Sequence, residues 1–214
     1  MKLWVKKFVL GPLSTNTYLV HDENGNCIIF DPSSGCEAVL KEIDNSKLVP
    51  EAIVLTHAHF DHIIGIDEIK QKHAQIPVYI HPDEKIMLEN PQFNGSFMIG
   101  LSYTYTGPTQ DMVEGKMRIG SFDVDIMLVP GHSPGGCAIK IDKYLFCGDI
   151  LFAGSIGRSD LLGGDGQKLI NGIKEKIIVL PDETVVCSGH GGRTTIGREK
   201  KTNPYLTDDN NTSY

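Results

Sequence analysis

The stretch that most constrains this chain is THAHFDH, residues 56–62, which ends a short apolar run, EAIVLT. Three of the eight histidines and one aspartate fall within six positions, which is either an accident of polar residues or a metal site. The apolar run is typical of a buried strand, and in extended backbone side chains two apart point the same way. His57 and His59 can therefore hold one ion. Asp61 and His62 follow as the chain bends into a helix, so they can face a neighbouring point.

Three further candidate ligands occur at the ends of other expected strands. His132 lies in LVPGHSPGG, Asp149 closes YLFCGD, and His190 lies in VVCSGHGG. Loops at strand ends are where rigid scaffolds present chemistry, and neighbouring glycines let the backbone approach closely. One such histidine alone is usually structural, but the joint pattern predicts a metal site. The remaining histidines lack this context and are expected to be surface or capping residues: His21, His73 and His81.

Hydrophobic patterning predicts alternating strands and helices. Strands are expected at 3–10, 17–20, 27–31, 51–56, 77–81, 136–141, 144–149 and 184–189, with a strand pair over 116–130. Helices are expected at 36–44, 64–73, 82–90, 163–178 and 195–206. Residues 91–115 are expected to form a long loop, which either flanks the site or is an irregular surface segment.

These elements form two strand-rich blocks, each with helices, and so predict an α+β fold. Two β-sheets would pack face to face with helices outside. A chain of 214 residues without an obvious linker is expected to be one domain over 1–205, followed by a polar tail at 206–214.

Composition narrows the possible partners. The net charge of −7 argues against nucleic acid, whose phosphates need a basic field. The five cysteines are scattered singly, which predicts reduced, mostly buried thiols in a cytoplasmic protein. No segment has the length of a membrane helix, and the apolar N-terminal run is too short for a signal peptide. A small molecule is the expected substrate, and the oligomeric state stays open.

At the candidate ligands the sequence resembles the metallo-β-lactamase superfamily, whose H-x-H-x-D-H motif matches His57, His59, Asp61 and His62. The family's later His, Asp and His match His132, Asp149 and His190. The resemblance spans nearly the whole chain and implies an αββα sandwich with the metal site at one edge of two mixed sheets. The stretches TNTYLV, LFAGSIGRSDLLGGD and GHGGRTTIGREKKTNPYL resemble small bacterial hydrolases of glyoxalase II (hydroxyacylglutathione hydrolase) type.

The resemblance also implies a ligand assignment. His57, His59 and His132 would hold a first metal, and Asp61, His62 and His190 a second. Asp149 would bridge the two ions, where zinc β-lactamases commonly carry a cysteine ligand. Two divalent ions are expected, with zinc first and iron or manganese as alternatives. A bridging hydroxide would attack the carbonyl of a thioester such as S-lactoylglutathione, and Asp61 would orient it.

Substrate recognition is expected from Arg158 and Arg193, which lie near ligand loops and could pair with a substrate carboxylate. A structural salt bridge is the alternative for each. The chain stops soon after TNPYL, whereas typical glyoxalase II has additional C-terminal helices that help to bind glutathione. Competing functions are a mononuclear iron persulfide dioxygenase, which would use His57, His132 and Asp149, a lactonase or other ester hydrolase, and metal binding without catalysis.

Overall fold

The computed structural model describes residues 2–207 and divides into two compact units. The first unit comprises the chain up to residue 112 together with 118–122, and the second comprises 113–117 and the chain from 123 onward. Of the expected polar tail, residues 208–214 lie outside the described part, whereas 206 and 207 end a short helix. Within residues 2–207 no helix is both long and apolar enough to cross a membrane.

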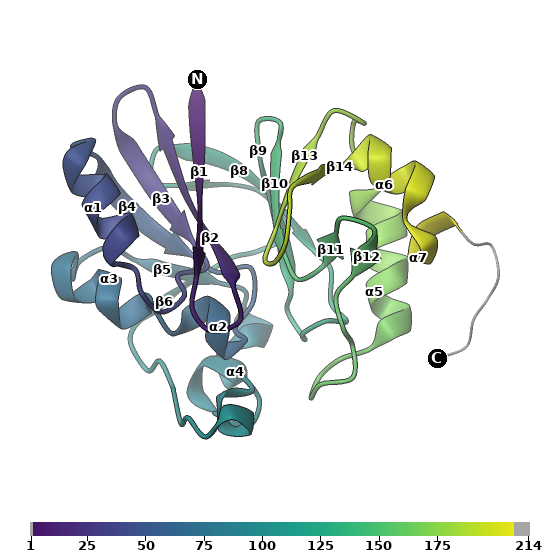
Figure 1. The fold of residues 1–214 in the computed structure, drawn as a ribbon, viewed down its shortest axis with the longest axis horizontal. Coiled ribbons are helices and arrows are strands. Elements are labelled where there is room, and N and C mark those ends of the chain that lie inside the picture. The colour runs from purple at the N-terminus through teal and green to yellow at the C-terminus, as the bar shows by residue number, and fades with distance from the viewer. Residues whose placement is uncertain (1, 208–214) are drawn as a thin grey trace. The chain divides into compact units, whose positions relative to one another are not determined.

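The first unit is built on a six-stranded mixed sheet with strand order β1-β2-β3-β4-β5-β6 (Figure 1). Its strands are β1 (Leu3–Leu10), β2 (Thr15–Asp22), β3 (Asn26–Phe30), β4 (Val49–Val54), β5 (Val78–Ile80) and β6 (Thr109–Asp111). The first two pairings are antiparallel and the last three are parallel. The carboxyl ends of β3, β4 and β5 therefore meet at one edge, which is where the THAHFDH segment begins.

The helices of this unit pack against the sheet and bury its apolar residues. They are α1 (Glu37–Asn45), α2 (Phe60–Ile63), α3 (Ile66–Lys72), η1 (Pro82–Glu84), α4 (Lys85–Glu89) and η2 (Ser96–Ile99). Val39 and Ile43 of α1 and Ile69 of α3 share one buried apolar cluster with Ile29 and Ile53 of the sheet. Figure 1 shows α1 and α3 side by side along the sheet. A packed core beneath the ligand loop keeps that loop rigid.

The second six-stranded sheet has the order β14-β13-β10-β9-β8-β7. Its strands are β7 (Gly115–Ile119), β8 (Phe122–Leu128), β9 (Cys137–Ile141), β10 (Tyr144–Gly148), β13 (Val185–Ser188) and β14 (Thr194–Thr195). A small ribbon follows β10 and consists of β11 (Leu151–Phe152) and β12 (Ser155–Ile156). β10 and β13 are parallel neighbours, so the segments that follow them emerge at the same edge.

Helices of the second unit are α5 (Gly166–Gly172), η3 (Ile173–Ile177, a π-helical turn), α6 (Ile196–Thr202) and α7 (Pro204–Thr207). Leu169, Ile173 and Ile177 pack against Leu145 and Val186 of the sheet in a second buried cluster. Asp165 caps α5 by accepting a hydrogen bond from the backbone N–H of Lys168 at 3.0 Å. The GGDG stretch, residues 163–166, thus forms the turn that leads into α5.

The expected elements mostly match, with two informative differences. Residues 91–115 contain η2 and β6 rather than an uninterrupted loop. β6 has the sequence TQD, which shows no alternation of apolar and polar residues. It is an edge strand, and only its pairing with β5 makes it a strand. The expected helix at 163–178 begins at Gly166 and widens into a π-turn at Ile173, immediately after Gly172.

Candidate metal centre

The ligand loop of the first unit follows directly from the end of β4. His57, His59, Asp61 and His62 are all buried, with side chains that share a small volume. The ring centroids of His57 and His62 lie 4.2 Å apart, and those of His57 and His59 lie 4.9 Å apart. The expectation that these residues gather after one strand is met within this unit.

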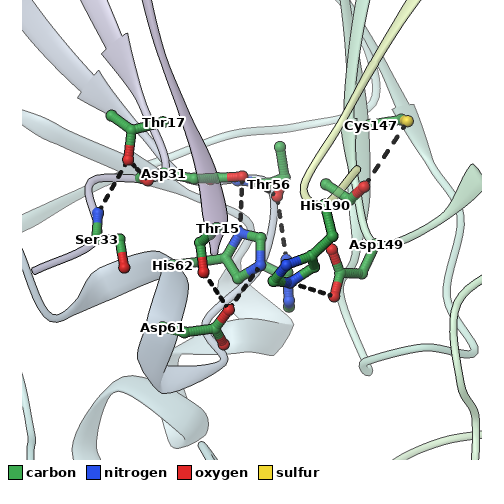
Figure 2. A network of polar contacts seen from close by, with 12 residues as sticks. Thr15, Thr17, Asp31, Ser33, Thr56, Asp61, His62, Cys147, Asp149 and His190 are labelled. Carbon is green, nitrogen blue, oxygen red and sulfur yellow. Dashed lines mark hydrogen bonds and ion pairs between the residues drawn. The ribbon is translucent and has the colours of Figure 1, made fainter. Parts of the chain in front are cut away.

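A buried aspartate, Asp31, organises this loop from the end of β3 (Figure 2). One carboxylate oxygen accepts from the backbone N–H of Thr56 at 2.8 Å. The other accepts from the Thr56 hydroxyl at 2.7 Å and lies 3.1 Å from Nδ1 of His62. Because a carboxylate only accepts, His62 carries its proton on Nδ1 and presents the lone pair of Nε2. A carboxylate oxygen of Asp31 also lies within 4.8 Å of nitrogens of His57 and His62. Because both oxygens already accept hydrogen bonds from Thr56 and His62, we assign Asp31 to orienting the metal ligands and not to binding the metal itself.

Glu84 fixes the same loop from η1. Its carboxylate is fully buried and accepts from the backbone N–H of Ala58 at 2.8 Å. Ala58 separates His57 from His59, so this bond anchors the extended turn between the two rings. A second anchor is the backbone N–H of Phe60, which donates to the carbonyl of Asn94 at 2.9 Å.

Asp61 is oriented by β2. The hydroxyl of Thr15 donates to Oδ2 of Asp61 at 2.7 Å, as Figure 2 shows. The same oxygen lies 3.4 Å from Nε2 of His62. A hydroxyl partner fixes the carboxylate while leaving it negatively charged, which suits either a metal ligand or a group that orients water.

In the second unit, His132 is held by its Nδ1. This nitrogen lies 2.7 Å from the carbonyl oxygen of Arg158. Because a carbonyl oxygen can only accept, Nδ1 carries the proton and Nε2 presents its lone pair. The preceding Gly131 has φ +131°, and a Cβ there would lie 2.4 Å from the backbone oxygen of Asp165. Only glycine lets the loop pass this close to the turn before α5.

Asp149 directly follows β10, and its surroundings require a second glycine. A Cβ added at Gly157 would lie 1.8 Å from the carbonyl oxygen of Asp149 and 3.2 Å from Nδ1 of His132. The ribbon after β10 therefore folds back onto both candidate ligands. His190 lies beyond β13, and its carbonyl accepts from the hydroxyl of Ser188 at 2.9 Å.

The spacing of these atoms fits metal ligands. Oδ2 of Asp149 lies 3.4 Å from Nε2 of His190 and 3.7 Å from Nε2 of His132. Two ligand atoms bound tetrahedrally at about 2.1 Å from an ion are roughly 3.4 Å apart. The 3.4 Å between Asp61 and His62 matches as well. With imidazole and carboxylate donors, the set suits zinc, iron or manganese.

The two arginines expected to bind substrate lie in the second unit. Arg158 is exposed and forms a two-bond fork with Asp160, with both N–O distances 2.7 Å. Arg193 is exposed in the loop between β13 and β14 that also carries His190. For Arg158 the salt-bridge alternative is thus realised, although an exposed ion pair is exchangeable.

The other candidate groups are structural. All five cysteines are free and buried, as predicted. Burial raises the pKa of the Cys36 thiol to about 12, and its Sγ donates to the carbonyl of Ser33. The Sγ of Cys147 donates to the carbonyl of Leu151 at 3.4 Å. His81 accepts from the backbone N–H of Asp83, the capping role expected for it.

Sequence reasoning did not identify Asp31, Glu84 or Thr15 as partners of the ligands. Asp31 ends a strand, as the predicted ligands do, so the same rule could have found it. Glu84 has no such signal, because it lies in a short 3₁₀ turn and reaches Ala58 across 26 positions. Thr15 is the first residue of the TNTYLV stretch but carries no local pattern that indicates contact with Asp61.

The family of the chain follows from its sequence. A profile of the metallo-β-lactamase superfamily matches residues 10–190. The chain belongs to this superfamily. The protein named probable metallo-hydrolase YqgX of Bacillus subtilis (strain 168) is 41% identical over 207 residues, covering 94% of this chain and 96% of that protein. Hydroxyacylglutathione hydrolase GloC of Haemophilus influenzae is 33% identical, covering 89% and 92%.

Solved structures agree on the fold. The BLEG-1 B3 metallo-β-lactamase has a TM-score of 0.91 and 42% identity, covering 96% of this chain and 100% of that one. TTHA1623, solved in a di-iron-bound form, has a TM-score of 0.85 and 37% identity, covering 94% and 100%. The predicted α+β fold with two mixed sheets is therefore confirmed, and superfamily membership together with the histidine and aspartate clusters supports a metal-dependent hydrolase.

Proposed function

We propose that the protein is a dinuclear metal-dependent thioesterase of glyoxalase II type, with S-lactoylglutathione as a representative substrate. The proposal rests on the seven ligand positions that the superfamily resemblance implies and on the 33% identity to the hydroxyacylglutathione hydrolase GloC over most of both proteins.

The observation that carries the dinuclear part is the position of Asp149. One of its oxygens lies close to Nε2 of both His132 and His190, at 3.7 and 3.4 Å. In the proposed assignment these histidines would serve different ions, and a carboxylate close to both would bridge the two ions. His57 and His59 would complete the first site with His132. Asp61, His62 and His190 would form the second.

Two bound divalent ions would supply Lewis-acid chemistry, lowering the pKa of water and polarising a carbonyl. The chain's own residues prepare that site. Asp31 and the Arg158 carbonyl hold the Nδ1 protons of His62 and His132, which leaves both Nε2 atoms available as ligands. Thr15 fixes the Asp61 carboxylate, which we assign to orienting the attacking water. Zinc is the proposed metal, with iron or manganese as alternatives, and TTHA1623 with its two irons supports iron.

A thioester suits such a site because a thiolate leaves without a strong general acid. The reaction splits the C–S bond by addition of water and yields a carboxylic acid and a thiol. Arg193, exposed beside His190, is proposed to pair with a carboxylate of the substrate. No protein nucleophile is needed, since the water attacks the carbonyl carbon directly.

A second candidate is hydrolysis of a β-lactam amide. It is favoured by the 42% identity to BLEG-1, which is described as a B3 metallo-β-lactamase. The attacking group would be the same, but the leaving group is an amine, which requires a proton that a thiolate does not. A lactone or another ester is a third substrate class of the same chemistry.

Parallel assays with S-lactoylglutathione, a chromogenic cephalosporin and a simple lactone test these alternatives. Asp149→Asn is expected to lower kcat/KM for the preferred substrate by at least about 100-fold, because the bridging carboxylate is lost. Asp142→Asn is the matched control, since this exposed aspartate has φ +52°, which asparagine tolerates, and lies outside the site. A kcat/KM highest for the cephalosporin would replace the thioesterase assignment with the second candidate.

A further inference from the structure

The second unit contains a cavity of about 660 Å³ beside two candidate ligands. This volume is in the range of pockets that bind small molecules. Its walls come from β12, the turn after it, the start of α5 and α7. The cavity lining includes Gly157, Arg158 and Asp160.

The cavity wall is continuous with the support of the metal ligands. Gly157 is packed against the carbonyl of Asp149, with no room for a Cβ. The carbonyl of the next residue, Arg158, accepts the Nδ1 proton of His132 at 2.7 Å. A molecule in this cavity would therefore lie against the same backbone that positions two ligands.

The positively charged residue among the lining residues is Arg158, and its side chain is already paired with a carboxylate. Nε and Nη2 of Arg158 each donate to one oxygen of Asp160 at 2.7 Å. Such a parallel pair of bonds is the geometry in which guanidinium recognises any carboxylate. The Nε–Nη2 edge of Arg158 is thus able to hold a carboxylate, and Arg158 lines the cavity.

The pair is well placed for exchange. Both side chains are exposed, at 59% for Arg158 and 67% for Asp160, and exposed ion pairs contribute little to stability. The hydrogen bonds from Arg158 lower the pKa of Asp160 to about 2, so the carboxylate is charged at any ordinary assay pH. A carboxylate that approaches the Nε–Nη2 edge of Arg158 would thus compete with the charged Asp160 side chain.

We propose that this cavity binds the carboxylate-bearing part of the substrate and that Asp160 is a built-in competitor for Arg158. A substrate carboxylate replaces Asp160 as the partner of Arg158, and the Asp160 side chain rotates into the solvent. Asp160 then sets specificity by weakening the binding of anionic thioesters while leaving the binding of neutral ones unaffected. This inference rests on the proposed function for the identity of the substrate, but the binding it describes does not depend on catalysis.

The test is a calorimetric binding experiment on the metal-loaded protein. The probes are S-methylglutathione, a thioether that cannot be hydrolysed as a thioester, and its diethyl ester, in which both carboxylates are neutralised. Asp160→Asn is expected to tighten binding of the acid by up to about fivefold, the equivalent of an exposed ion pair. Arg158→Gln is expected to weaken it by about tenfold through loss of the charge-assisted fork. The affinity for the diethyl ester should change by less than about twofold in either variant, because both carboxylates of this probe are esterified and cannot pair with Arg158.

A double variant and a control separate the fork from bulk charge. In the Arg158→Gln background, Asp160→Asn should have no further effect if it acts through the arginine. Glu183→Gln removes one exposed negative charge of the same unit outside the cavity lining and should leave both affinities unchanged. Equal tightening of acid and ester, or tightening that persists without Arg158, would overturn the inference.

The outcomes also separate this inference from the proposed function. If the variants behave as expected but S-lactoylglutathione is not hydrolysed, the cavity binds a carboxylate ligand and the thioesterase assignment fails. If hydrolysis proceeds but binding of the acid probe is unaffected by both single variants, the competitor role of Asp160 is wrong.

Discussion

Replacing Asp31 by asparagine should weaken metal binding without disturbing the backbone. Asp31 has φ +48°, in the left-handed region that asparagine also adopts readily. The substitution turns one acceptor oxygen into an NH₂ donor. If the donor faces His62, it opposes the proton on Nδ1 and favours the tautomer with Nε2 protonated, which cannot bind a metal. If it faces the backbone N–H of Thr56, that donor loses its acceptor instead.

The expected magnitude follows from these bonds. A hydrogen bond to a charged group contributes about 1.5–3 kcal/mol, and the Asp31 oxygen nearest His62 also accepts from the Thr56 hydroxyl at 2.7 Å. Loss of one such bond corresponds to about 10- to 100-fold in metal affinity, the range found when partners of ligating histidines are removed. The metal-free protein should lose about 1–3 kcal/mol of unfolding free energy as well.

Zinc affinity would be measured by competition with a chromogenic chelator, and stability by urea unfolding of the metal-free protein. Asp22→Asn is a matched control, because Asp22 is also buried in the first unit and accepts two backbone N–H bonds at 2.9 Å, but in the β2–β3 turn. It should lower stability and leave zinc affinity unchanged. A zinc affinity of Asp31→Asn equal to that of Asp22→Asn would refute the reasoning and make Asp31 purely structural.

Three other substitutions test neighbouring parts of the account. Glu84→Ala should cost about 1–3 kcal/mol of unfolding free energy by leaving the N–H of Ala58 unsatisfied, with Glu84→Gln restoring most of it in the same urea titration. Gly157→Ala should reduce bound metal, measured by elemental analysis, and cost about 1–3 kcal/mol of stability, because its Cβ would overlap the carbonyl of Asp149; full metal content would contradict the packing argument. Arg193→Ala should raise KM for anionic thioesters more than for neutral ones, and equal increases would discard its carboxylate role.

Much of the fold was predictable because its strands have apolar runs ended by glycine, proline or ligand residues. β4, β10 and β13 stop one to three residues before His57, Asp149 and His190, as the strand-end argument requires. β6 was not predictable, since three polar residues at a sheet edge form a strand only through pairing with β5. The π-turn after α5 likewise depends on packing rather than on local propensity.

The candidate ligands were found from local spacing, but their partners were not. Asp31 reaches Thr56 across 25 positions, and Thr15 reaches Asp61 across 46. Such contacts arise from strand order in the sheet, which no local pattern encodes. Arg158 was expected to bind substrate, yet its fork with Asp160 is evident only once the turn after β12 brings the two side chains together.

The most direct test of the central claim is elemental analysis of the purified protein combined with an assay of S-lactoylglutathione hydrolysis on the same sample. The account predicts about two metal ions per chain, as a shared bridging carboxylate requires, together with rapid hydrolysis. About one iron per chain, no hydrolysis, and oxygen uptake with glutathione persulfide would contradict it and assign the protein to mononuclear iron oxygenase chemistry.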